Sequence, residues 1–347
     1  MSLVLITGSS GLVGSESVNF FSEKGFDVVG IDNNLRKFFF GNDGSTLWVK
    51  KALLKNNKRF KHYSTDIRSY EALERIFKKY KKKISLIIHC AAQPSHDYGK
   101  NYPIIDFEVN AKGTLNLLEL TKKYCFDAKF IFMSTNKVYG DNPNRIELKE
   151  KNNRWEVGSK SQYLNGIKEN FSIDHCTHSF FGASKTYADL IVQEYGKNVG
   201  LNTVCFRGGC ITGPNHSGAK LHGFLSYLVK LSLKERRYSI IGYKGKQVRD
   251  NLHSHDLVNC FWEFYKKPRK GEVYNIGGGR HSNCSIIEAL ELIEKLKNIS
   301  IKKEYLKTPR VGDHIWYISN LNKFKKHYPK WKQKYNTKKI INELLYS

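Results

Sequence analysis

The sequence predicts an α/β fold, with a doubly wound parallel sheet followed by a smaller C-terminal substrate lobe. Over the first 200 residues, short apolar runs typical of buried strands alternate with amphipathic segments typical of helices. After Gly213-Pro214 this alternation gives way to isolated helices and short strands. We therefore expect a nucleotide-binding domain over residues 1–206, its sheet completed by part of 245–279, and a mainly substrate-binding lobe over 207–347.

Residues 1–32 form one predicted strand–turn–helix–strand unit, with strands at 4–7 and 28–31 and a helix ending near residue 24. In the turn, Gly8 permits the tight bend, Gly11 lets the backbone approach a pyrophosphate, and Gly14 lets the helix pack closely on the sheet. The helix N-terminus then offers free N–H groups to the phosphates. This arrangement predicts a Rossmann-type dinucleotide site.

The acid that closes the second strand indicates which dinucleotide binds. Asp32 stands where a carboxylate accepts hydrogen bonds from both hydroxyls of the adenosine ribose, which favours NAD over NADP. Arg36 leaves an alternative open, since a basic side chain just past the acid could meet the 2′-phosphate of NADP. We expect NAD, with further contacts from Ser10, Leu12, Val13 and Asn33.

The remaining elements continue the alternation. Strands are expected at 59–64, 84–89, 129–134 and 202–206, and helices at 113–124, at 182–197 and around the i, i+3, i+4, i+7 set Leu73, Ile76, Phe77 and Tyr80. Residues 272–279 are expected to return to the main sheet. Two long segments, 37–57 and 141–180, interrupt the pattern, and we expect both to be lids over a substrate because loops of that length are usually functional.

Composition excludes several classes of protein. A hydrophobic content of 40% in 347 residues indicates a globular chain, and no apolar run reaches the length of a membrane span. The first residues lack a basic leader, and the seven cysteines contain no C-x-x-C pair, so we expect a cytoplasmic protein without a signal peptide, disulfide frame or metal site. The net charge of +26 is dispersed over helices, which favours solvated faces; an RNA-binding surface is the minor alternative.

Five further motifs carry a resemblance. They are S-T-N-K-V-Y-G-D at 134–141, S-F-F-G-A-S-K at 179–185, G-L-N-T-V at 200–204, G-K-Q-V-R-D at 245–250 and Y-N-I-G-G at 274–278. With the glycine turn, they resemble the extended short-chain dehydrogenase/reductase family over nearly the whole chain, and within it the CDP-tyvelose (CDP-paratose) 2-epimerase group. The 4,6-dehydratases of that family carry an Asp-Glu pair where Asn136-Lys137 stand here, so dehydration is set aside.

The resemblance implies a catalytic group of a hydroxyl residue, a tyrosine and a lysine. Thr135 matches the first and Lys185 the last, but the tyrosine position holds Phe181, which has no proton to exchange. Three explanations stay open: an engineered inactive variant, a natural branch that uses another acid or base, and a pseudoenzyme that only binds. For the second explanation, which we favour, the candidate substitutes are His178, Tyr163, Cys176 and Tyr187, with His178 first because its ordinary pKa is near neutral.

The resemblance also assigns binding residues. Arg249 and Arg310 would grip the diphosphate of a nucleotide sugar, and guanidinium forks suit that group. The other implied substrate contacts are Asn136, Cys210 and Asp313, and the other implied cofactor contacts are Asp66, Ile67, Ala91, Ala92, Gln93 and Asn110.

The expected function is epimerisation of a nucleotide-linked sugar, with a CDP-sugar favoured, by transient oxidation at a ring carbon, C2 by resemblance. The alternatives are a 4-epimerase or reductase, and a protein that binds NAD and a sugar nucleotide without catalysis. A homodimer is also implied, formed by helices 111–124 and 182–198, whose apolar residues extend beyond one face. Those residues are Leu115, Leu117, Leu118, Tyr187, Leu190 and Ile191.

Overall fold

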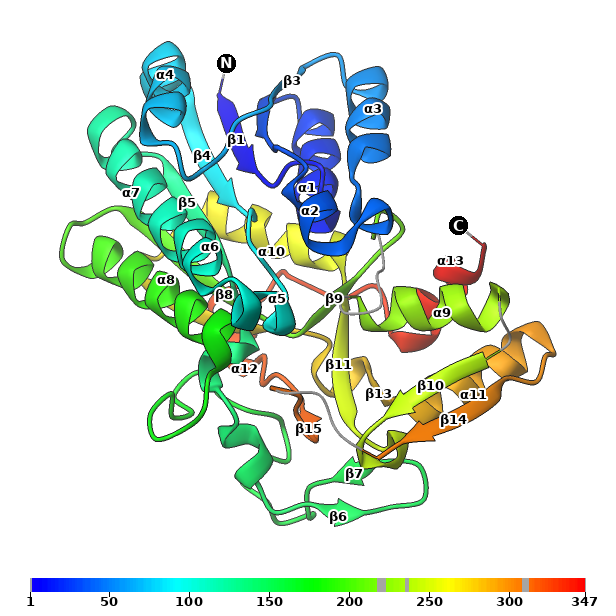
Figure 1. The fold of residues 1–347 in the computed structure, drawn as a ribbon. Helices are drawn as coiled ribbons and strands as arrows, with labels where there is room; N and C mark the ends of the chain where they lie inside the picture. Colours follow the sequence, from blue (N-terminus) through cyan, green and yellow to red (C-terminus); the bar gives the residue numbers. More distant parts are fainter. Residues whose placement is uncertain (1, 217–222, 235–236, 308–311, 347) are drawn as a thin grey trace.

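A computed structural model describes residues 2–216, 223–234, 237–307 and 312–346. Its central layer is a seven-stranded sheet in the order β12-β8-β5-β4-β1-β2-β3, and every neighbouring pair is parallel. The strands are β1 (Leu3–Thr7), β2 (Asp27–Ile31), β3 (Phe60–Tyr63), β4 (Ile84–His89), β5 (Lys129–Thr135), β8 (Asn202–Gly208) and β12 (Glu272–Ile276). The predicted Rossmann-type sheet is confirmed (Figure 1).

Helices cover both faces of this sheet, which explains why its strands read as almost continuous apolar runs. On one face lie α4 (Tyr70–Tyr80), α7 (Gly113–Tyr124) and α8 (Ser179–Lys197), whose buried side chains share a core with Leu5 and Val29. On the other face lie α1 (Leu12–Glu23), α3 (Leu47–Asn56), α10 (Ser254–Lys266) and α12 (Asn322–His327), which pack with Val4 and Ile6. Alternate residues of β1 therefore serve two separate cores.

The second lobe lies near the carboxyl ends of the central strands (Figure 1). Its helices are α9 (Phe224–Lys234), α11 (Ile286–Lys297) and α13 (Thr337–Tyr346), and they enclose a core of their own with β10 (Arg237–Ile241). Strand β10 pairs in parallel with β14 (Lys302–Leu306). A further small sheet joins β9 (Cys210–Thr212), β11 (Val248–His253), β13 (Asn283–Ser285) and β15 (Trp316–Tyr317). Helix α11 begins with a capping box between Ser285 and Glu288.

Neither long interruption has the form expected of it. Residues 37–57 fold mainly as α2 (Leu35–Phe40) and α3, and Val49 and Leu53 of α3 are buried in the sheet's core. Residues 141–180 contain β6 (Lys149–Glu150) and β7 (Trp155–Glu156), and their backbone is fixed to the second lobe where Ile167 N donates to Ile318 O at 2.7 Å. Both segments are therefore packed parts of the fold.

Two short helices were not predicted, α5 (His96–Asn101) and α6 (Pro103–Phe107). The apolar face expected on residues 111–124 also needs correction, because Leu117 and Leu118 are fully buried in the sheet's core. The exposed apolar side chains of this region belong to α6 and α8 instead. They are Ile104, Phe107, Phe180, Tyr187 and Leu190. Within the described ranges, no helix combines the length and apolar character needed to cross a lipid bilayer.

Candidate active site

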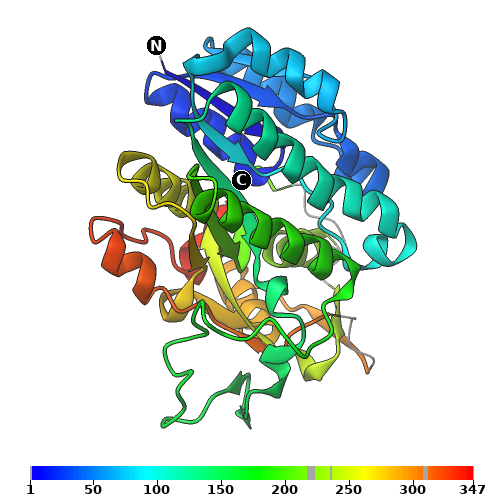
Figure 2. The same cartoon turned by 90° about the vertical axis from the view of Figure 1, so that its left-hand side faces the viewer.

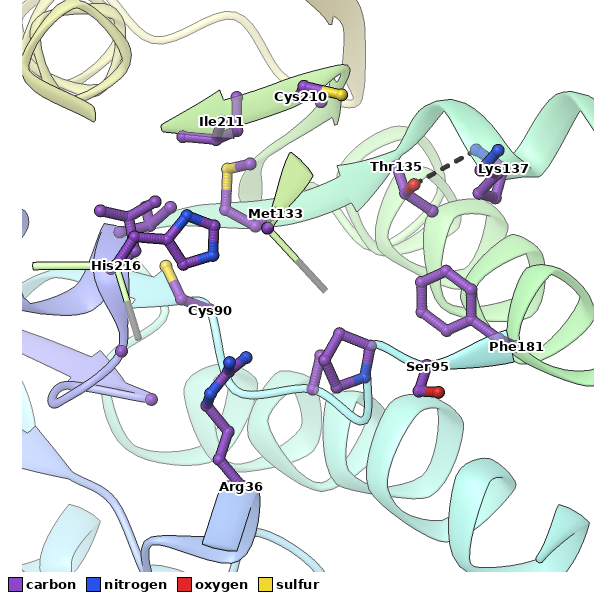
Figure 3. A pocket seen from close by; sticks show the side chains of 18 of the residues that line it. Arg36, Cys90, Ser95, Met133, Thr135, Lys137, Phe181, Cys210, Ile211 and His216 are labelled. Atoms are coloured by element: carbon purple, nitrogen blue, oxygen red, sulfur yellow. Dashed lines mark hydrogen bonds between the residues drawn. The ribbon is translucent and has the colours of Figure 1, made fainter. Parts of the chain in front are cut away.

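A cavity of about 510 Å³ lies where the central strands end and the second lobe begins. Its walls come from the glycine turn, the ends of β2, β4 and β5, the first turn of α8, and β9 to β11 of the second lobe. Figure 3 shows Arg36, Cys90 and His216 at one end and Thr135, Lys137 and Phe181 at the other. Ligands of open α/β sheets bind at this edge, beyond the carboxyl ends of the strands.

The glycine turn forms a close-packed phosphate cradle. Gly8 has φ +67°, and its N–H donates to Ile31 O at 2.8 Å. A Cβ on Gly14 would lie 2.0 Å from Gly8 O, so only glycine permits this approach of turn and helix. Gly11 caps α1 without a side-chain hydrogen bond, and the buried Oγ of Ser10 has no partner among the described residues. The N–H groups of the first turn of α1, which begins at Leu12, fit a pyrophosphate. Ser10, which the sequence also placed in the cofactor site, does not line the cavity.

The carboxylate predicted to bind the ribose is held by backbone groups. Asp32 accepts hydrogen bonds from Ser10 N at 3.0 Å and Asn34 N at 2.7 Å, and burial raises its pKa. Arg36 also lines the cavity, with its guanidinium 4.9 Å from the Phe40 ring centre, and burial lowers its pKa to about 10.

The predicted adenine contacts lie beside this carboxylate. Asn33 Nδ2 donates to Asp66 Oδ2 at 3.0 Å, and Asp66 pairs with Arg68 at 2.7 Å. Ile67 lines the cavity next to them. The structure thus brings together Asp32, Asn33, Arg36, Asp66 and Ile67, five residues that the sequence placed in the cofactor site.

At the opposite end, Thr135, Phe181 and Lys185 all line the cavity. Thr135 Oγ1 accepts a hydrogen bond from Lys137 N at 3.2 Å (Figure 3). Phe181 and Lys185 lie one turn apart on α8, and Lys185 Nζ donates to Met133 O at 2.8 Å. Burial lowers the pKa of Lys185 to about 8. Two members of the implied catalytic group are therefore in place, and a phenyl ring occupies the third position.

The favoured substitute for the tyrosine is not brought to this group. His178 does not line the cavity, and its Nε2 lies 2.9 Å from Ile173 O. Cys176 and Tyr163 are also outside it, and Tyr187 is partly exposed on the outer side of α8. None of the described cavity residues comes from 141–180, so the lid expected there was wrong. That segment packs against β15 of the second lobe instead.

Two cavity residues were missed by the sequence analysis as candidates for catalysis, Lys137 and His96. Lys137 Nζ donates to Gly312 O at 2.7 Å, and burial, reinforced by Arg249, lowers its pKa to about 8. His96 Nδ1 lies 2.8 Å from Ser179 Oγ, and burial lowers its pKa to about 3. The signal for Lys137 was its place two residues after Thr135, which had served only to exclude dehydration. Nothing in the sequence around His96 distinguished it.

The second lobe supplies the wall predicted to bind substrate. Arg249 donates to Val248 O at 2.8 Å and is paired with the Asp313 carboxylate. Cys210 and Asn136 line the same region, and burial raises the pKa of the Cys210 thiol to about 11. Arg310, the second predicted diphosphate contact, lies outside the described residues.

Gln93 and Asn110 are buried behind the cavity wall rather than in it. Gln93 N donates to Asn110 Oδ1 at 2.9 Å, and Asn110 Nδ2 donates to Ser184 Oγ at 3.0 Å. Ala91 and Ala92, which precede Gln93, do line the cavity. The buried amides thus tie the loop after β4 to α8 and hold the cavity wall in position.

One family model, several curated proteins and many solved structures are similar to this chain. The model of the NAD dependent epimerase/dehydratase family matches residues 4–277. A CDP-paratose 2-epimerase from Salmonella typhi is 31% identical over 327 residues, covering 92% of this chain and 91% of that protein. A dTDP-D-glucose 4,6-dehydratase from Dictyostelium discoideum is 32% identical over 300 residues, covering 86% of this chain and 62% of that protein. The fold of a UDP-glucose 4-epimerase from Bifidobacterium longum, solved with NAD+ and UDP, is similar, with a TM-score of 0.79, 23% identity and coverage of 99% and 97%.

Proposed function

Because this chain belongs to the NAD dependent epimerase/dehydratase family, we propose that it inverts a nucleotide-linked sugar at C2, with a CDP-sugar as substrate. The family resemblance drawn from the motifs is confirmed, and NAD is the cofactor. The proposal for C2 rests chiefly on one observation, the similarity to a CDP-paratose 2-epimerase over 92% of the chain.

The polar groups of the cavity support epimerisation over dehydration. Elimination of water needs a paired acid and base beside the sugar. After Thr135 the chain offers Asn136 and Lys137, and no glutamate is among the described residues that line the cavity. An amide and an amine next to Thr135 can bind and orient a sugar hydroxyl, but they do not form an acid pair.

In the proposed reaction, bound NAD supplies the hydride acceptor and later the hydride donor, so no net redox change occurs. The glycine turn and Asp32 would hold its pyrophosphate and ribose. Thr135 would orient the reacting sugar hydroxyl, and Arg249 would bind the diphosphate of the substrate. Lys185, whose Nζ is held by Met133 O, would position the nicotinamide ribose.

Phe181 favours a second candidate, a protein that binds NAD and a sugar nucleotide without turning it over. A phenyl ring at this place cannot take a hydroxyl proton, and His178 lies outside the cavity. A 4-epimerase or reductase is the remaining alternative, and Phe181 weakens it equally.

One experiment separates these candidates. The purified protein is incubated without oxygen with CDP-paratose, UDP-glucose and dTDP-glucose in D2O, and the products are followed by NMR. We expect a C2 epimer from CDP-paratose only, without deuterium at C2, because the hydride removed from that carbon returns to it. Thr135→Val is the matched control, expected to keep bound NAD and to lose turnover. Binding of CDP-paratose without any epimer would support the second candidate.

We further propose a cytoplasmic homodimer. The exposed apolar side chains of α6 and α8, including Ile104, Phe107 and Leu190, form an unpartnered face that a second copy would cover. Figure 2 shows α8 and α7 side by side, but Leu117 and Leu118 of α7 are buried in the sheet's core, so α6 and α8 would supply the apolar contacts of this pairing. A monomer by light scattering at micromolar concentration would contradict it.

A further inference from the structure

Lys137 lies on the same wall of the cavity as Thr135 and Phe181 (Figure 3). It belongs to the 3-10 turn Asn136–Tyr139 that follows β5, and this turn packs against the start of α8. A Cβ on Gly182 would lie 3.1 Å from Lys137 O, so the two backbones are in close contact directly beside Phe181.

The amine of Lys137 is connected to the Phe181 ring through two intervening residues, Gly312 and His96. Lys137 Nζ donates to Gly312 O at 2.7 Å. A Cβ on Gly312 would lie 2.8 Å from His96 Cε1, and the His96 ring is 5.1 Å from the Phe181 ring, edge to face. Gly312 and His96 therefore connect the Lys137 amine to the phenyl ring across one part of the cavity.

We propose that Lys137 carries the sugar-hydroxyl proton that a tyrosine at position 181 would carry. The inference rests on the proposed function, since it assigns the proton transfer that epimerisation requires. An amine donates and accepts protons, and the backbone of Lys137 already contacts Thr135 Oγ1, the group expected to orient the sugar oxygen.

The surroundings of Lys137 make its ammonium group easier to deprotonate than that of an ordinary lysine. Burial and the positive charge of Arg249 on β11 lower its pKa, Asp313 and Cys210 act in the opposite direction, and the resulting pKa is about 8. His96 and His314 are the other titratable groups coupled to it, and burial keeps both uncharged by lowering their pKa values. At pH 7 about one Lys137 in ten is therefore neutral and able to accept a proton, and the neutral share reaches about half near pH 8.

Lys185 is less suited to this step, although its pKa is also lowered to about 8. Its Nζ donates to Met133 O on β5 and lies 4.1 Å from the Phe132 ring centre, which directs it toward the sheet. It also sits where the family resemblance places the lysine that holds the nicotinamide ribose.

The proton balance of the proposed step is simple. With bound NAD as the hydride acceptor of the proposed reaction, the hydrogen on the sugar carbon would leave with its electron pair to NAD, the hydroxyl proton would pass to the neutral amine of Lys137, and the C–O bond would become a ketone. When the hydride returns to the opposite face of that carbon, the Lys137 ammonium returns its proton to the oxygen. The amine ends each turnover neutral, and neither water nor another oxidant takes part.

The test compares Lys137→Met, Lys137→Arg and the control Lys323→Met, a lysine outside the cavity whose Nζ donates to Val273 O at 2.9 Å. Turnover of CDP-paratose, bound NAD and CDP affinity are measured for each purified holoprotein. We expect both Lys137 variants to lose about 10²–10⁴-fold in kcat, the range typical of a proton-transfer group, with NAD content retained. The kcat of the wild type should fall as the pH drops below about 8, because the amine becomes protonated.

A rescue and a titration complete the test. Adding Phe181→Tyr to Lys137→Met should raise kcat at least tenfold over that of Lys137→Met alone. A structural role for Lys137 predicts no such rescue. In NMR spectra of lysine labelled at Cε, the resonance missing from Lys137→Met should titrate near pH 8. An active wild type with an equally active Lys137→Met, or a Lys137 resonance unchanged up to pH 10, overturns the assignment. A wild type that forms no epimer refutes the proposed function, and the proton role with it.

Discussion

Replacing Gly14 by alanine should open the phosphate cradle, and the size of the effect follows from the packing of the turn. The new Cβ would lie 2.0 Å from Gly8 O, 2.7 Å from Gly8 C and 2.8 Å from Ser9 Cα. These are backbone atoms, so the turn and α1 must separate by at least about 1 Å to relieve the clash. Gly8 cannot absorb the shift freely, because a Cβ at its own position would already lie 2.8 Å from Ala91 N.

Three contributions set the change in the free energy of unfolding that Gly14→Ala causes. Overpacking costs about 1–3 kcal/mol. Loss of the hydrogen bond from Gly11 N to Gly8 O, now 3.0 Å, costs about 1 kcal/mol. Alanine stabilises a helix over glycine by about 0.5–1 kcal/mol, which offsets part of the cost. We expect a net loss of about 1–3 kcal/mol, together with a ten- to hundredfold weaker affinity for NAD if one charged hydrogen bond to the pyrophosphate is lost.

The assays are urea unfolding and calorimetric titration with NAD, with two further variants for scale. In Gly11→Ala the new Cβ would lie 3.3 Å from Gly8 O, which predicts a smaller loss of stability in urea. In Gly158→Ala its nearest neighbour is Lys149 Cε at 3.9 Å, which predicts none. If Gly14→Ala matched Gly158→Ala in both assays, neither the stability of the cradle nor its affinity for NAD would depend on this close approach.

Three other predictions follow from contacts described or present in the same structure. Arg249→Ala should weaken CDP affinity about ten- to hundredfold by calorimetry while NAD content stays unchanged. The control is Arg280→Ala, whose guanidinium pairs with Glu156 at 2.9 Å and which should change neither CDP affinity nor NAD content. Asp189→Asn should cost about 3–5 kcal/mol in urea unfolding, because the buried Arg207 loses the carboxylate now 2.7 Å from its Nη2; for Glu304→Gln, which breaks an exposed pair, about 0–1 kcal/mol is expected. Burial lowers the pKa of His96 to about 3, so below pH 6.5 the unfolded chain gains a proton on this side chain that the folded chain does not. The free energy of unfolding should therefore fall as the pH drops from about 6.5 toward 3. An equally steep fall in His96→Asn would contradict this.

The strands and helices of the central sheet could be predicted because the pattern of apolar residues within each segment is enough to indicate its secondary structure. Strand 84–89 and helix 113–124 were predicted with the bounds that the structure gives, since an apolar run or a helical period is visible without tertiary context. The lid predicted over 141–180 was wrong for the converse reason, whereas 37–57 contributes Thr46 to the cavity wall. Polarity and length describe a segment's exposure, but only packing shows that Val49 and Leu53 join the core or that Ile167 is fixed to the second lobe.

The cofactor end of the cavity could be predicted further than the catalytic end. Gly8, Gly14 and Asp32 act through turn geometry and a fixed offset along the chain, which a sequence displays directly. The substitution of tyrosine by Phe181 was visible, but the group that compensates for it depends on which distant segments meet. His178 is close to Phe181 along the chain and turns away to Ile173, whereas Lys137 is more than forty residues distant and faces the cavity.

The late position of β12 in the chain has a consequence for biosynthesis. β12 pairs with β8 along its length, and α10 lies beside α1 and covers the part of the same sheet face that α1 does not reach. While the protein is being made, both the outer edge of β8 and that apolar face stay bare until residues 254–276 have left the ribosome. An unpaired strand edge beside bare apolar surface is prone to associate with other chains. A nascent chain stalled near residue 206 would therefore be a client for chaperones, and a gene split at that point should yield soluble protein only when both halves are produced together.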